Sequence, residues 1–167
     1  MYKIGVIGHR NIKKDELKIY KNKVYEFLKK KHIFNSNLLI VSPLADGADR
    51  LVVNVAKKLN IPFIAFLPMP PEVYVFDFSF KSMKKFQKLL QEAKEINVIP
   101  QKSVKNYKEL KCEQYIALSK QIVQECDEFI VLWDGTFNNK LGGTSETVKL
   151  ICKSKKEYTH ILLSRDI

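Results

Sequence analysis

Apolar runs of strand length alternate with amphipathic helical stretches along the chain, and this alternation restricts the fold more than any other feature. The strand-like runs cover residues 3–7, 38–42, 63–67, 95–99, 128–133 and 158–163. Between them apolar residues recur at helical spacing, as at Leu51, Val55 and Leu59. Strands that are apolar on both faces indicate a parallel sheet, because right-handed crossovers lay the connecting helices over both faces. The sequence therefore predicts an α/β fold, with a mainly parallel sheet of about six strands flanked by helices on both faces.

Length and composition narrow the class of protein. With 167 residues and 46% hydrophobic content, the chain can bury one core, so we expect one domain over residues 1–167. The apolar stretch at residues 61–71 is shorter than the roughly 20 residues that span a membrane. Because the first residues enter a strand pattern directly, we expect a cytoplasmic protein without membrane association. The three cysteines lie in helical patterns and lack metal-type spacing, so we expect no metal site.

The net charge of +11 leaves the partner open between nucleic acid, an anionic metabolite and neither. Only three of the 29 basic residues are arginines, namely Arg10, Arg50 and Arg165. Most lysines fall on helical segments, which is typical of solvated outer faces. A nucleic-acid partner is possible but not favoured, because no series of aromatic residues accompanies these lysines.

Nearly all unusual residues lie in strand-to-helix links. In a Rossmann-like domain these links meet at the carboxyl edge of the sheet, where ligands bind. The irregular segments at residues 68–78, 100–108 and 134–141 all follow strands and therefore belong to that edge.

Two glycine-containing links come first along the chain. Gly8 allows close approach of a ligand to the backbone, and Arg10 offers a planar set of donors for phosphate or carboxylate. The second link opens directly into a helix whose first amides could hold an anion. We therefore expect ligand contacts at Gly8, His9, Arg10, Leu44, Gly47, Ala48 and Arg50. Two alternatives stay open: a tight turn with a surface arginine, and an internal salt bridge between Asp49 and Arg50.

Two later links complete the expected site. An aromatic, proline-rich link carries Tyr74 and Asp77, which suit the wall of a base or ribose site, although it could also be a packed loop. Two glycines before hydroxyl residues at a helix N-terminus favour phosphate through the helix dipole. The expected ligand contacts there are Tyr74, Trp133, Asp134, Gly142, Gly143, Thr144 and Ser145. Glu146 and Asp77 are the candidate catalytic carboxylates, but Glu146 could instead stabilise its helix.

The ordered motifs resemble the SLOG superfamily, which unites DNA-processing protein A, the Lonely Guy phosphoribohydrolases and sensor domains of bacterial conflict systems. The motifs are Gly8-His9-Arg10, residues 42–51, Leu67-Pro68 with Tyr74 and Asp77-Phe78, Trp133-Asp134-Gly135 and Gly142-Gly143-Thr144. The resemblance implies a Rossmann-like fold and a site for nucleotides or nucleotide-derived signals, closest to the sensor type. The phosphoribohydrolase motif places its glutamate three residues after a threonine. Here Glu146 is two residues after Thr144, which turns the carboxylate by about 100° on a helix.

Three functions follow from these residues. The leading hypothesis is a binding domain that senses or sequesters a nucleotide-derived ligand, such as a signal related to NAD or ADP-ribose or a cyclic nucleotide, in a bacterial or phage conflict system. The first alternative is an N-glycosidic-bond hydrolase of the phosphoribohydrolase kind. The second is a nucleic-acid-binding protein. We expect no required cofactor besides the bound ligand, and the resemblance favours a homo-oligomer.

Overall fold

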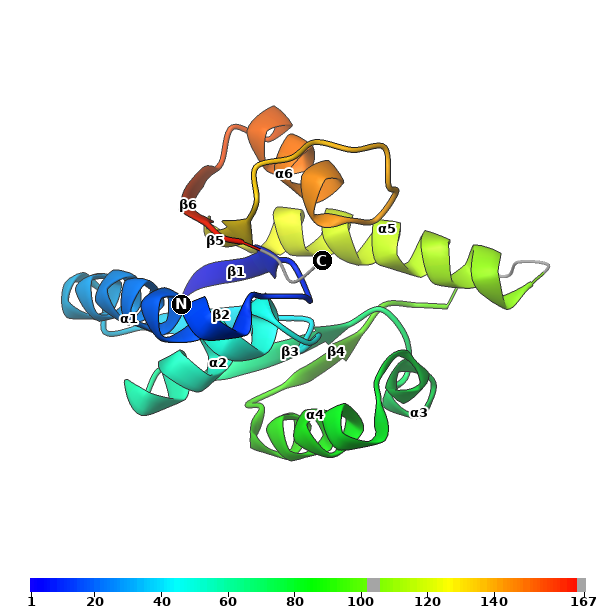
Figure 1. Cartoon of the computed structure of the whole chain (residues 1–167), viewed down its shortest axis with the longest axis horizontal. Helices are drawn as coiled ribbons and strands as arrows, with labels where there is room; N and C mark the ends of the chain where they lie inside the picture. Colours follow the sequence, from blue (N-terminus) through cyan, green and yellow to red (C-terminus); the bar gives the residue numbers. More distant parts are fainter. Residues whose placement is uncertain (102–105, 165–167) are drawn as a thin grey trace.

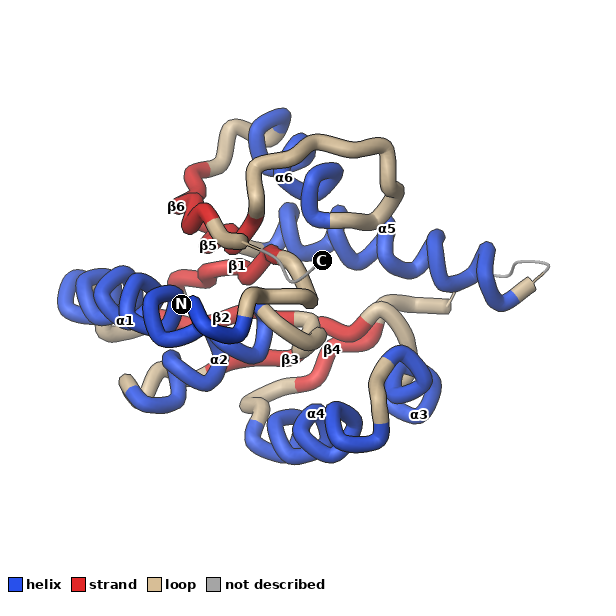
Figure 2. The backbone as a smooth tube through the Cα atoms, in the orientation of Figure 1, coloured by secondary structure: helices blue, strands red, loops and turns tan. Residues whose placement is uncertain are grey.

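One six-stranded parallel sheet forms the centre of the protein. The computed structural model describes residues 1–101 and 106–164. The strand order is β4-β3-β2-β1-β5-β6, and every neighbouring pair in it is parallel. The strands are β1 (Tyr2–Gly8), β2 (Leu38–Ser42), β3 (Phe63–Leu67), β4 (Ile96–Val98), β5 (Glu128–Trp133) and β6 (Glu157–Leu162). Because all six strands are parallel, the loops that follow β1, β2 and β5 emerge together at one edge (Figure 2).

Helices cover both faces of this sheet (Figure 1). One face carries α1 (Leu17–Phe34), α2 (Ala48–Lys58) and α4 (Phe80–Glu92), and the other carries α5 (Tyr107–Glu125) and α6 (Thr144–Lys153). Three short elements lie in connections: η1 (Lys14–Glu16), α3 (Pro71–Tyr74) and η2 (Val75–Asp77). No helix in the described part of the chain is long and apolar enough to cross a membrane.

The two faces bury separate hydrophobic cores. In β1, Ile4 and Val6 belong to the core beneath α1, α2 and α4, whereas Ile7 belongs to the core beneath α5 and α6. All residues of β2, β3 and β5 are buried. This two-sided burial explains why these strands read as continuous apolar runs, because a parallel sheet has no solvent face.

The predicted α/β class and parallel Rossmann-like sheet are confirmed. The bounds of β2, β3 and β5 match the expected residues, and β4 is shorter than the expected run at residues 95–99. The segment at residues 68–78 was expected to be irregular, but it contains α3 and η2. Pro71 explains the difference, because proline fits the first position of a helix as well as a loop. Of the segment at residues 100–108, residues 102–105 lie outside the described part, and α5 begins at Tyr107.

The bends after β1 and β2 are packed backbone against backbone. Gly47 precedes α2 with a φ of 78°, and a Cβ atom there would lie 2.2 Å from the carbonyl oxygen of Arg10. The amide of Ala48 donates to the carbonyl oxygen of His9 at 3.0 Å. Glycine at position 47 therefore allows the start of α2 to contact the Gly8-His9-Arg10 bend directly.

Gly47→Ala should destabilise the fold much more than Gly135→Ala. Both glycines have positive φ, but a Cβ at Gly135 would meet nothing closer than 3.9 Å. We expect a cost of about 1 kcal/mol at Gly135 from backbone strain and about 3 kcal/mol or more at Gly47, where a clash is added. Urea denaturation measures both values. Equal costs would show that the contact between the two bends is not tight.

Candidate functional site

A cavity of about 770 Å³ lies at the carboxyl edge of the sheet. It is lined by the bend after β1, the link before α2, one side of α5 and the start of α6. Its volume is within the range of about 300–1,000 Å³ that is typical of ligand sites. Eight of the sequence-predicted contact residues line it: Gly8, His9, Arg10, Tyr74, Gly142, Gly143, Thr144 and Ser145. The separate links of the sequence therefore meet around one cavity.

The charged residues that line this cavity are mainly basic. Arg10, Lys108, Lys111 and Lys140 line it, while the carboxylate among its lining residues is that of Asp49. Such a balance of charges attracts an anion, and the low-dielectric walls of a cavity strengthen the attraction. No group of three or more His, Cys, Asp and Glu side chains in the described residues could hold a metal ion.

The N-terminus of α6 adds backbone donors to the cavity. Gly143 caps the helix, and the first amides of a helix have no acceptors within it. The hydroxyl of Ser145 donates to Asn138, so this side chain is already bonded within the preceding loop. The donors that remain for an anion are therefore the backbone amides at the start of α6 and the hydroxyl of Thr144, which lines the cavity.

Arg10 is the most constrained basic residue of the lining. Its Nη2 atom donates to the hydroxyl of Tyr115 at 2.6 Å. Its guanidinium also lies 5.6 Å from the ring centre of Tyr115 and 5.9 Å from that of Phe78. These contacts hold the side chain in one orientation at the cavity wall, with 38% of it still exposed.

Six of the expected contact residues lie outside the lining: Leu44, Gly47, Ala48, Arg50, Trp133 and Asp134. Arg50 is 7% exposed and has a structural environment. It donates to the carbonyl oxygen of Leu44 and to Asp46, both at 2.8 Å, and to Ser82. The geometry therefore supports the alternative in which Arg50 forms a salt bridge within the protein, but the partner is Asp46 and not Asp49.

Trp133 and Asp134 also make contacts within the protein. Trp133 is 3% exposed and packs against Phe137 and His160, with ring centres 4.8 and 5.6 Å apart. Asp134 accepts a hydrogen bond from the amide of Thr136 at 2.9 Å and lies 3.1 Å from Nε2 of His9. Asp134 thus contacts a lining residue without lining the cavity itself.

The two candidate catalytic carboxylates are engaged by neighbouring groups. Glu146 accepts a hydrogen bond from the amide of Gly142, which closes the turn before α6. Asp77 pairs with Lys111 and Arg10, and its side chain is 3% exposed. Neither residue lines the cavity. In this structure both carboxylates therefore hold neighbouring parts of the site in place, Glu146 the turn before α6 and Asp77 the side chains of Arg10 and Lys111.

Sequence reasoning missed the contribution of α5. This helix places Lys108, Lys111, Cys112, Tyr115, Leu118, Ser119 and Ile122 along the cavity. Gln114 ties the same helix to the loop after β3, because its amide donates to the carbonyl oxygen of Pro68 at 2.8 Å. These residues belong to no glycine-containing link. Their spacing of three and four residues along one helix is the only sequence signal they carry.

Asp49 is a buried acid in the cavity wall. Burial raises the pKa of its carboxyl to about 7, although the amide of Ala45 and the charges of Arg10 and Arg50 oppose the rise. A folded-state pKa above the unfolded value means that the folded protein binds the proton more tightly. This contribution to stability is complete below the unfolded pKa of about 4 and is lost as the pH rises through about 7.

Asp49→Asn should remove this pH dependence, because an amide keeps the acceptor for Ala45 but does not ionise. Relative to the variant, the free energy of unfolding of the wild-type protein should fall by about 2–4 kcal/mol between about pH 4 and about pH 8. Urea denaturation across this pH range measures the difference. A constant difference would contradict the raised pKa.

Solved structures of DNA processing protein A share this fold. No protein-family model and no curated protein matches the sequence. The X-ray structure of DNA processing protein A from Streptococcus pneumoniae superposes with a TM-score of 0.66 and 21% identity, covering 98% of this chain and 51% of that one. DNA processing protein A from Helicobacter pylori, described for its single-stranded DNA binding mode, gives 0.62 and 19%, covering 95% and 64%. This chain therefore spans about half of the first protein and just under two thirds of the second.

These structures correct the leading hypothesis from the sequence. That hypothesis, sensing or sequestering of a nucleotide-derived signal, is wrong by this comparison, because both matched proteins are DNA-processing proteins and one is described as binding single-stranded DNA. The sequence placed a nucleic-acid partner last because no series of aromatic residues accompanies its lysines. The folded chain instead gathers Lys108, Lys111 and Lys140 around one cavity. The chain has the Rossmann-like fold of DNA-processing protein A, the fold that its resemblance to the SLOG superfamily implied.

Proposed function

We propose that this chain binds single-stranded DNA, with a short stretch of the strand held at the cavity on the carboxyl edge of the sheet. The observation that carries the proposal is the basic lining of the cavity, formed by Arg10, Lys108, Lys111 and Lys140. The shared fold with DNA-processing protein A, and the single-stranded DNA binding named for the Helicobacter pylori protein, support the same partner.

The shape of the site favours an unpaired strand over a duplex. A concave site accepts a sugar and base only if they leave the base stack, and that costs a few kcal/mol in duplex DNA but much less in a single strand. The amides at the start of α6 and the nearby basic residues offer donors for successive phosphates. Binding of this kind depends on the backbone of the strand and tolerates many base sequences.

Two exposed aromatic residues that adjoin cavity-lining residues in the chain offer surfaces on which bases can stack. Tyr107 is 49% exposed and precedes Lys108 on α5, and Phe137 is 56% exposed and precedes Asn138 in the loop before α6. Lys149 Nζ lies 5.6 Å from the ring centre of Phe137. Stacking of a base on an aromatic ring contributes about 1–3 kcal/mol. Each of these exposed rings is thus close in the chain to a lysine of the cavity lining, Tyr107 to Lys108 and Phe137 to Lys140.

The wild-type protein should bind an oligothymidylate of about 20 nucleotides more tightly than the same length of duplex, in fluorescence anisotropy. Affinity should fall with salt, and Lys140→Ala should reduce the steepness of that dependence by about 0.7. Arg10→Ala should weaken binding by about tenfold through loss of a charged contact.

Lys30→Ala is the matched control, because Lys30 is exposed on α1 and lies on the opposite face of the sheet. It removes the same charge and should change the affinity by less than about twofold. An equal loss of affinity in Lys140→Ala and Lys30→Ala would show that binding depends on net charge alone. Absence of binding to oligothymidylate at low salt would overturn the proposal, and tighter binding to oligouridylate would replace DNA by RNA.

A further inference from the structure

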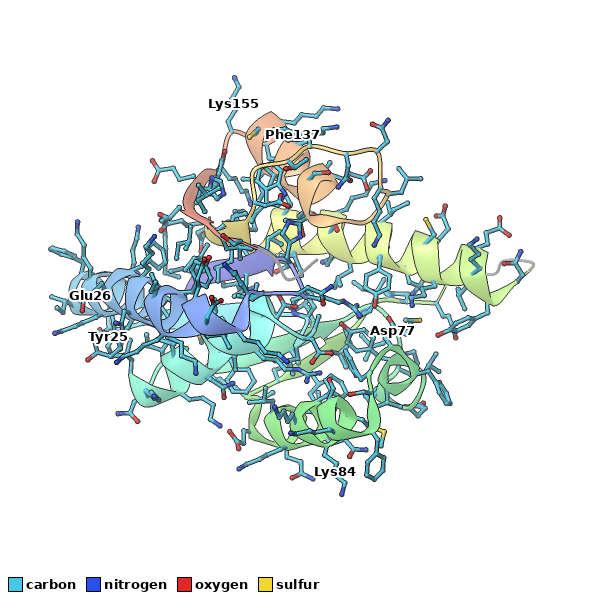
Figure 3. The ribbon with its side chains drawn as sticks, in the orientation of Figure 1. Tyr25, Glu26, Asp77, Lys84, Phe137 and Lys155 are labelled. Carbon is cyan, nitrogen blue, oxygen red and sulfur yellow. The ribbon has the colours of Figure 1, made fainter. Side chains whose placement is uncertain are left out.

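Asp77 lies directly behind three residues of the cavity wall. Its Oδ1 atom is 2.5 Å from Lys111 Nζ, and its Oδ2 atom is 3.6 Å from Arg10 Nη2 and accepts a hydrogen bond from the hydroxyl of Tyr115. Arg10, Lys111 and Tyr115 line the cavity, whereas Asp77 does not. Figure 3 shows Asp77 between the α3 region and α5, in agreement with these contacts. The carboxylate therefore contacts its partners from the protein side and leaves their other side to the cavity.

The hydroxyl of Tyr115 links Asp77 to Arg10. A hydroxyl carries one proton, and donating it to Asp77 turns the oxygen lone pairs toward Arg10 Nη2 at 2.6 Å. Burial raises the pKa of Tyr115, so the hydroxyl stays protonated and keeps this direction. Asp77 and Tyr115 together fix the plane of the Arg10 guanidinium.

Asp77 also keeps two like charges close together. Arg10 comes from the bend after β1 and Lys111 from α5, and both are attracted to the same carboxylate. Without that carboxylate the two cations would repel each other and turn toward solvent. With it, the cluster keeps a net charge of about +1 and presents both cations to one side.

We propose that Asp77 is a positioning residue that arranges Arg10, Lys111 and Tyr115 into a seat for one phosphodiester group. The inference rests on the proposed binding of single-stranded DNA and identifies where one phosphate of the strand binds. The phosphate accepts from Arg10 and Lys111 on the cavity side, and Asp77 supports both from behind without touching the strand.

Asp77→Asn tests this role, because positioning and simple charge attraction predict opposite changes in the affinity for oligothymidylate. The substitution removes a negative charge beside the cavity, so attraction of charge alone predicts tighter binding of oligothymidylate. Positioning predicts weaker binding, by about five- to twentyfold, and a salt dependence less steep by about 0.7, because one phosphate contact is lost. Glu72→Gln is the matched control, since Glu72 is an exposed acid on α3 and its loss changes the net charge equally. This control should leave the affinity unchanged or slightly higher.

Tyr115→Phe provides a second variant without any change of charge. It removes the hydroxyl that joins Asp77 to Arg10 and should weaken binding by about three- to tenfold. Thermal unfolding of both variants shows whether they remain folded. Tighter binding by Asp77→Asn, or wild-type affinity in Tyr115→Phe, would overturn the positioning role.

A measurement on the free protein separates this role from the proposed function. The chain has only three arginines, so the guanidinium N–H signals can be assigned by nuclear magnetic resonance with Arg10→Lys. In the wild-type protein the Nη–H signals of Arg10, whose Nη2 atom makes these contacts, should exchange slowly with water, and Asp77→Asn should accelerate this exchange at least about fivefold. If the wild-type protein fails to bind DNA but shows this difference, the proposed function fails and the positioning of Arg10 stands. Equal exchange in both proteins would contradict the positioning itself.

Discussion

The site depends on the close backbone contact between the bend after β1 and the start of α2. β1 lies between β2 and β5, so parallel pairing brings the ends of these strands to one edge. Gly47 then allows the first amide of α2 to reach the carbonyl oxygen of His9. This contact fixes the path of the chain at Arg10, from which its side chain reaches α5. The geometry of the basic lining thus follows from a steric requirement at a glycine that does not itself line the cavity.

Charge within the site is organised by carboxylates that stay out of the cavity. Asp46 engages Arg50, Asp77 engages Arg10 and Lys111, and Glu146 caps the turn before α6. Each of these acids is bonded to a donor within the protein, and none of them lines the cavity. The basic side chains in the lining therefore make the electrostatic potential in the cavity positive. Asp49 differs from these acids because it lines the cavity, but its raised pKa reduces its negative charge near neutral pH. An anionic partner thereby meets positive charge at Arg10, Lys108, Lys111 and Lys140.

The sequence predicted the fold more completely than the site. Strands β2, β3 and β5 could be predicted to the residue because burial on both faces leaves a continuous apolar run. Gly8 and Gly142 were predicted to lie at the site, and both line the cavity. A tight bend requires glycine at a particular position, and such a local requirement can be recognised in a short stretch of sequence. Arg50 was predicted to bind a ligand, but its contact with Ser82 spans 32 positions and no short motif reveals it. Lys111 and Tyr115 escaped notice because only the folded chain turns their face of α5 toward the other bends.

The length of α5 has a mechanical consequence. This helix has 19 residues and so extends about 28 Å, with Lys111 in its first third and Tyr115 near its middle. At its C-terminal end, Lys156 donates to the carbonyl oxygens of Val123, Gln124 and Cys126. One helix thus joins the cavity wall to the chain segment that enters β6, and three hydrogen bonds from Lys156 fix its C-terminal end there.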